Sequence, residues 1–147
     1  MNGYLSYATK TLVVEGAAAA GTSTLTTDAV DMTGFNAARF IWFLGDVTSG
    51  SVITATVLTE SDGNASGGTS AAAGTEITAG ASDYDSTLLI VDVLRPADRY
   101  VYSTLARGTQ NAVVNGCICE LYNARSLPVT QHASAMQLTV AVQGGDS

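Results

Sequence analysis

The fold is decided by residues 37–44, which read Ala-Ala-Arg-Phe-Ile-Trp-Phe-Leu. The run predicts a buried β-strand, because aromatic and branched side chains dominate it. It is apolar on both of its faces apart from Arg39. A strand of this kind is expected where one face packs on the core and the other face meets a partner.

Alternation and β-branched residues dominate the rest of the chain, and helical periodicity is almost absent. Turns are indicated between the alternating runs, including one at residues 31–34, where Asp31 can bond the backbone ahead and Gly34 can take a positive φ. The longest loop signal covers residues 61–74, which are small and polar. Further strands are predicted at residues 7–14, 25–30, 51–60, 75–78, 87–94, 99–107 and 112–122.

This spacing of strands and turns predicts an all-β fold, a single antiparallel β-sandwich or jelly-roll-like domain with extended terminal arms. The length of 147 residues suits one domain. We expect an N-terminal arm and first strand in residues 1–24, the sandwich in residues 25–128, and a C-terminal arm or edge strand in residues 129–147. The predicted core comprises Phe40, Trp42, Leu89, Val91, Val101, Leu105 and Ile118.

The composition narrows the classes of partner. Hydrophobic residues make up 46% of the chain, but charged residues only 13%, against roughly a quarter in typical domains. Much of the surface is therefore expected to be neutral and polar or covered by partners. The formal net charge of -7 disfavours nucleic acid and anionic membranes, which require clustered Lys and Arg. We also expect neither a transmembrane segment nor a signal peptide.

The sequence predicts no catalytic residue, no metal site and no cofactor. A hydrolase triad needs a base, and the single histidine, His132, lies in a polar tail after Pro128. On a strand, Cys117 and Cys119 would share one face about 6.5–7 Å apart, too far for a disulfide, so both are expected to be reduced core residues. The nearest paired carboxylates, Asp28 with Asp31 and Asp83 with Asp85, lie in or near predicted turns.

Arginines are the residues of interest. Four of the six basic residues, Arg95, Arg99, Arg107 and Arg125, fall in the last third of the chain, at strand ends or beside turns. One interpretation is structural, with each guanidinium paired to Asp92, Asp98 or Glu120. The other interpretation places them in subunit or docking interfaces, where Arg and Tyr are enriched, and adds Tyr100 to the set.

Three segments also resemble a family of small virion proteins of tailed bacteriophages, the capsid decoration or cement proteins. They are residues 91–100 (VDVLRPADRY), 107–114 (RGTQNAVV) and 121–129 (LYNARSLPV), with residues 31–35 (DMTGF) upstream. The resemblance covers roughly residues 25–130. It implies a non-enzymatic protein on the capsid surface, assembled in the bacterial cytoplasm. Its implied partners are the major capsid protein and further copies of itself, as a homotrimer.

Two other functions stay open at this point. A head-completion or tail-associated virion protein would form rings of more copies. A carbohydrate- or receptor-binding β-sandwich module would use an exposed loop such as residues 61–74, although that loop carries no aromatic platform.

Overall fold

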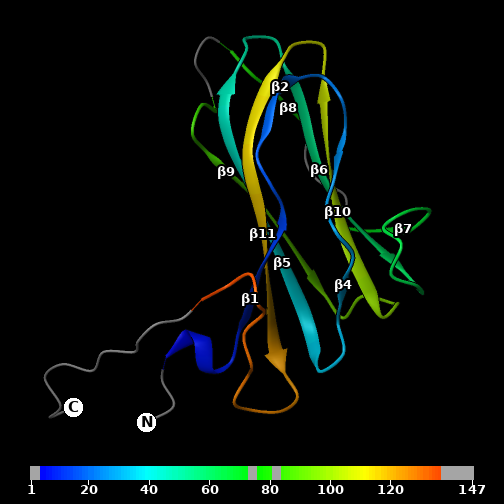
Figure 1. The fold of residues 1–147 in the computed structure, drawn as a ribbon. Helices are drawn as coiled ribbons and strands as arrows, with labels where there is room; N and C mark the ends of the chain where they lie inside the picture. Colours follow the sequence, from blue (N-terminus) through cyan, green and yellow to red (C-terminus); the bar gives the residue numbers. More distant parts are fainter. Residues whose placement is uncertain (1–3, 73–75, 81–83, 137–147) are drawn as a thin grey trace, which may run out of the picture.

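The computed structural model describes residues 4–72, 76–80 and 84–136, which form a β-sandwich of two antiparallel sheets (Figure 1). None of the helices in these ranges is long and apolar enough to cross a membrane. The elements are η1 (Leu5–Tyr7), β1 (Lys10–Glu15), β2 (Ala18–Gly21), β3 (Leu25–Thr26), β4 (Val30–Asp31), β5 (Phe35–Val47), β6 (Val52–Glu60), β7 (Thr69–Ala72), β8 (Ile77–Thr78), β9 (Leu88–Leu94), β10 (Tyr100–Gly108) and β11 (Ala112–Ala124).

The two sheets draw on strands that are distant in sequence. The first sheet has the order β1-β11-β5-β9, with β2 also paired to β11. The second sheet has the order β3-β10-β6-β7, with β4 on β10 and β8 on β6. All of these pairings are antiparallel, so the predicted all-β sandwich is confirmed.

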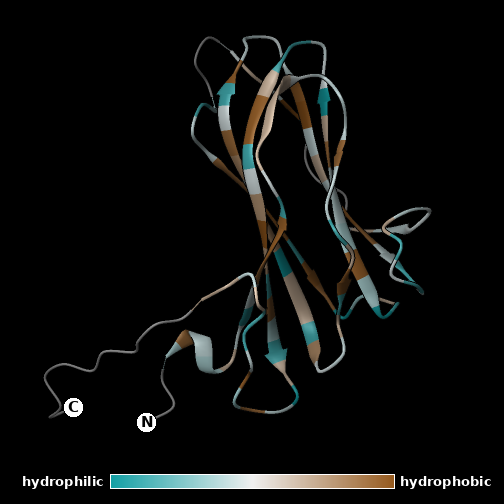
Figure 2. Ribbon diagram, in the orientation of Figure 1, coloured by the Kyte–Doolittle hydropathy of each residue, from teal (hydrophilic) through white to brown (hydrophobic). Residues whose placement is uncertain are grey.

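The core lies between the sheets, and β5 supplies its largest side chains. Phe40, Trp42 and Leu44 are almost fully buried and belong to the core cluster, with Ala38 beside them. Leu89 and Val91 of β9 pack against this cluster. Figure 2 shows hydrophobic stretches of the strands interspersed with neutral and polar ones. The burial of one face of residues 37–44 in the core therefore matches the prediction.

Strand β11 contains a bulge that corrects one predicted core residue. Register shifts occur on either side of Val114 in its pairing with β5, and Gly116 has φ +143°, a region that favours glycine. Before the bulge the inward-pointing side chain is that of Val114. After the bulge the inward-pointing side chains are those of Cys117 and Cys119, and all three lie in the core. Ile118 therefore points outward, and its prediction as a core residue is wrong.

Several predicted boundaries also change. Residues 5–7 form a short 3-10 helix, so the first strand begins at Lys10. The strand predicted at 25–30 is split into β3 and β4, and the loop predicted at 61–74 contains β7, which pairs with β6. The predicted turn at 31–34 is confirmed, since Asp31 accepts a hydrogen bond from the Thr33 backbone and Gly34 has φ +90°.

A described segment near the C-terminus, residues 129–134, runs along the edge strand β1 and the residues before it. The backbone N–H of Val129 donates to Tyr7 O at 2.9 Å. The Gln131 side chain accepts from Thr11 N at 2.9 Å, and the Ser134 hydroxyl accepts from Val13 N at 2.9 Å. Residues 129–134 therefore satisfy part of the open edge of the first sheet. Most of the C-terminal arm or edge strand predicted at 129–147 lies outside the described residues, which end at Met136.

Candidate functional site

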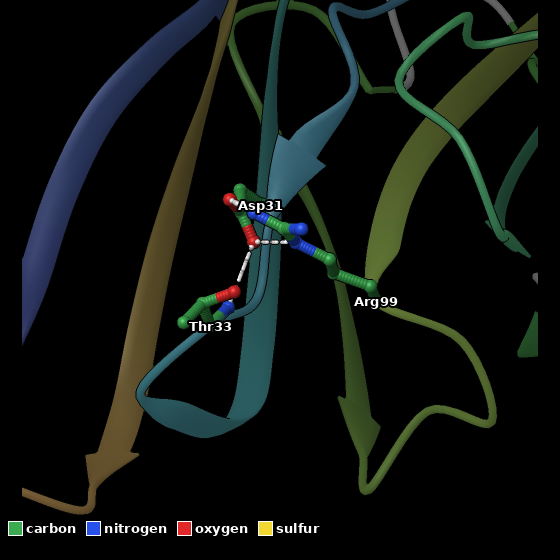
Figure 3. Close-up of polar contacts among 3 residues, drawn as sticks. All are labelled: Asp31, Thr33 and Arg99. Atoms are coloured by element: carbon green, nitrogen blue, oxygen red, sulfur yellow. Dashed lines mark hydrogen bonds and ion pairs between the residues drawn. The ribbon is translucent and has the colours of Figure 1, made fainter.

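A clamp between Arg99 and Asp31 fixes one end of the sandwich (Figure 3). The guanidinium donates from Nε to Asp31 Oδ1 at 3.0 Å and from Nη2 to Oδ2 at 2.7 Å. Thr33 adds two donors to Oδ1, its backbone N–H at 2.9 Å and its hydroxyl at 2.7 Å. The hydrogen bond from Arg99 is the main cause that holds the pKa of the Asp31 carboxyl well below its usual range. Arg99 and Thr33 thus stabilise the charged form of Asp31.

The same arginine also orders the neighbouring tyrosine. Its guanidinium carbon lies 5.1 Å from the centre of the Tyr100 ring, within the range of a cation–π contact. The Tyr100 ring also lies near Gly63, where an added Cβ would be 3.5 Å from the ring. Arg99 and Tyr100 therefore form a partly exposed pair at the start of β10.

Asn36 joins two further arginines at this end of the fold. Arg125 donates from Nε and Nη2 to Asn36 Oδ1 at 3.3 and 3.1 Å, and its backbone N–H donates to Gly34 O at 2.8 Å. The backbone N–H of Arg95 donates to Asn36 O at 2.7 Å. Asn36 is therefore a positioning residue that the sequence did not reveal, because nothing in the local pattern places it beside residues some sixty and ninety positions away.

These residues surround a hollow of about 460 Å³, which we call the arginine hollow. Three of the five predicted interface residues, Arg95, Arg99 and Arg125, lie around it, and Tyr100 follows directly in sequence. Asp98 is the acidic residue in its wall. The full lining is Met32, Thr33, Phe35, Asn36, Arg95, Pro96, Ala97, Asp98, Arg99 and Arg125.

The chemistry of the arginine hollow suits recognition. Its three arginines outnumber the two acidic residues beside them, Asp98 in the wall and Asp31, which is already engaged by Arg99. Arginine presents a planar fork of donors that fits a carboxylate, and a positive hollow in an acidic chain favours an acidic or carbonyl-rich protein surface. The lining supplies no histidine and no cysteine that could act as a base or nucleophile.

Arg107 does not belong to this site. It is only 4% exposed, and its guanidinium donates to the carbonyl oxygens of Ser23, Ala19 and Ala112 at 2.7–2.9 Å. A fourth bond joins it to the Ser23 hydroxyl at 3.0 Å. All of these hydrogen bonds lie within one chain, where they join the β2–β3 segment to β11. Its prediction as an interface residue is therefore corrected.

The predicted carboxylate partners of the arginines are also corrected. Arg99 pairs with Asp31, and Asp92 instead accepts a hydrogen bond from the Tyr122 hydroxyl at 2.8 Å. Glu120 lies 3.9 Å from Arg39. These pairs follow from the strand register, which no local motif encodes.

The cysteines and the histidine occupy the environments that the sequence indicated. Cys117 and Cys119 are free and buried in the core. Burial raises the pKa of the Cys117 thiol to about 12 and raises that of Cys119 as well. His132 is exposed, with its ring Nδ1 2.8 Å from the Ser134 hydroxyl. Within the described ranges, no three His, Cys, Asp or Glu side chains cluster so that they could hold a metal ion.

Comparison with known proteins finds similarity among solved structures. No protein-family model matches the chain, and no curated protein sequence matches it. A chain in the structure of infectious bursal disease virus Gx strain superimposes with a TM-score of 0.47 and 15% sequence identity. The match covers 82% of this chain and 34% of that viral chain, so this chain spans about a third of its length.

Proposed function

We propose that this protein is a structural component of a virion that decorates and stabilises the icosahedral capsid of a tailed bacteriophage. In this proposal it binds the outer surface of the major capsid protein lattice as a homotrimer, with the arginine hollow in the contact. It performs no chemistry.

The observation that carries the proposal is a convergence at the arginine hollow. Residues 31–35, 91–100 and 121–129, three of the four segments that resemble decoration proteins, are far apart in sequence. In the fold, parts of all three segments line the same hollow, contributing Thr33, Arg95 and Arg125 among others. A shared binding end would explain why these separate segments carry the likeness.

The physical properties of the chain support a docking role. Arg and Tyr are the side chains that most often anchor interfaces, and Arg99 and Tyr100 are held in place before any partner arrives. A protein that binds only the assembled lattice stabilises it by mass action. Three linked copies add avidity, so no single contact must be strong.

The terminal arms belong to the same proposal. Residues 1–24 supply β1 and β2 to the first sheet, and residues 129–134 run along β1. We propose that the remainder of one or both ends reaches a neighbouring copy or the shell. The chain would then be divided into an N-terminal arm and first strand (1–24), the sandwich (25–128) and a C-terminal arm or edge strand (129–147).

Co-sedimentation with phage heads assembled without this protein tests the proposal. The full chain should pellet with the heads, and the double variant Arg95→Glu, Arg125→Glu should lose most of this binding. The variant Lys10→Glu is the control, since it reverses a charge on β1, away from the hollow. Heads that fail to retain the unchanged protein, or equal retention of the double variant, would contradict the proposal.

A further inference from the structure

The outward face of the first sheet carries an exposed apolar region, and beside it Leu5 of η1 and Thr9 share a pocket with Arg39, Asp92 and Glu120. Side chains that point away from the core remain well exposed: Val13 at 49%, Phe43 at 36%, Leu88 at 50% and Ile90 at 44%. Solvent-exposed apolar side chains occur singly on most surfaces, but a contiguous set marks an interaction site.

The strand register shows that these side chains are contiguous. Val13 of β1 is opposite Ile118 of β11, Ile118 is opposite Ile41 of β5, and Ile41 is opposite Ile90 of β9. The four side chains therefore form one apolar row across all four strands. Ile41 is 7% exposed yet stands outside the core cluster, because its outward neighbours cover it.

A polar row runs directly beside the apolar row. Thr11, Glu120, Arg39 and Asp92 follow one another across the same four strands. Arg39 Nε lies 3.9 Å from Glu120 Oε1, too long for a hydrogen bond, and it is the buried side-chain nitrogen without a hydrogen-bond partner among the described residues. The positive and negative charges of this row are thus incompletely matched within one chain.

The geometry points to a second copy of this chain as the partner of this face. We propose that two copies stack their first sheets face to face about a two-fold axis that runs along the seam between β5 and β11. Such an axis places β5 over β11 of the second copy, and β9 over its β1. The proposal goes beyond the capsid-binding function and does not rest on it.

The face is self-complementary about that axis. Ile41 meets Ile118 of the second copy, and Ile90 meets Val13 of the second copy, so the apolar rows coincide. Arg39 meets Glu120 of the second copy, and the same pair forms again by symmetry, as an isologous interface requires. The exposed Phe43 meets Gly116 of the second copy, a position without a side chain. A single two-fold rotation thus brings together apolar side chains, opposite charges, and a large side chain with a glycine.

Face-to-face stacking is favoured over edge pairing on the β1 side. Gln131 and Ser134 of the same chain already accept hydrogen bonds from Thr11 N and Val13 N, so this edge offers fewer free backbone groups to another strand. Sheets that pack face to face interdigitate their side chains about 10 Å apart, and the apolar row suits that arrangement.

The mass of the full chain in solution tests the proposal. Analytical ultracentrifugation should give two chains per particle, or six if the homotrimer also forms. Ile90→Glu should halve the mass of the particle, to one chain or to three. Thr54→Glu, on the outward face of the second sheet, should leave the mass unchanged. A particle of one or three chains at every concentration would overturn the inference, while loss of head binding alone would count only against the capsid function.

A charge exchange between two chains gives the sharper result. Arg39→Glu alone and Glu120→Arg alone should each weaken pairing, because each places like charges opposite each other in the dimer. An equal mixture of the two variants should recover pairing as a mixed dimer, although the charges within each chain stay mismatched. If the mixture shows no recovery, the two-fold arrangement is wrong. If the full chain stays single but a chain ending at Met136 pairs, residues 137–147 occupy the face, which also overturns the proposal.

Discussion

The indole Nε1 of Trp42 donates a 2.9 Å hydrogen bond to the hydroxyl of Ser103, across the interior of the sandwich. Both residues are fully buried, Trp42 on β5 of the first sheet and Ser103 on β10 of the second. The Ser103 hydroxyl donates onward to Thr56 O at 2.8 Å. A polar bridge therefore fixes how the two sheets are placed within an otherwise apolar core.

Removal of this bridge should destabilise the fold. Ser103→Ala leaves the indole N–H buried without an acceptor, so we expect the free energy of unfolding to fall by about 1–3 kcal/mol. Trp42 is the single tryptophan, and its fluorescence reports urea unfolding directly. The exposed Ser126→Ala should change the midpoint little. Equal midpoints for the two variants would show that the bridge contributes nothing.

The buried Arg107 should matter for stability. Arg107→Met removes four hydrogen bonds, among them the buried one to Ala112 O, which should cost about 2–4 kcal/mol of unfolding free energy. Arg125→Met, at an exposed site, should cost less than about 1 kcal/mol. Chemical denaturation of both variants checks the order, and the reverse order would refute the assignment of Arg107 to the fold.

The Asp31–Arg99 clamp should give a defined pH dependence. A carboxyl whose pKa is lowered by folding contributes stability above its ordinary pKa of about 3.9, and that contribution is lost as the pH falls below this value. Asp31→Asn should therefore melt slightly below the unchanged protein at neutral pH, and the two should converge in acid. The effect is small because the pair is exposed to solvent. Arg99→Met should converge in the same way, and a constant difference at every pH would rule out the clamp.

The cysteines should resist modification in the folded protein. Because burial raises the pKa of Cys117 to about 12, almost no thiolate exists near neutral pH, and the core excludes the reagent. Mass spectrometry after iodoacetamide treatment should show no addition to the native chain and two additions after denaturation. Rapid native labelling would contradict the buried positions of both thiols.

Residues 37–44 carry most of what the sequence could predict. Their apolar character on both faces predicts a strand with the core on one side and a second surface on the other, and β5 has that form. The arginine hollow is predictable in part, because Arg95, Arg99 and Arg125 are unusual in so uncharged a chain. Their partners Asp31 and Asn36 were not identified as such, since the pairs depend on the contact between sequence-distant strand ends.

Ile118 and Arg107 show where the local pattern fails. The bulge at residues 114–116 shifts the alternation by one position, so counting in twos along β11 assigns Ile118 to the wrong face. The charge of Arg107 argues for the surface, yet main-chain carbonyls from β2, β11 and the segment before β3 converge on it in the fold. Both outcomes depend on non-local backbone geometry, which residue type and spacing do not encode.

Electron cryomicroscopy of phage heads assembled without this protein, imaged after its addition, tests the central claim most directly. The account predicts new density on the outer surface of the shell at repeated lattice positions, with the end that carries Arg95, Arg99 and Arg125 turned toward the capsid protein. Unchanged heads, or density confined to the portal or the tail, would contradict a decoration role.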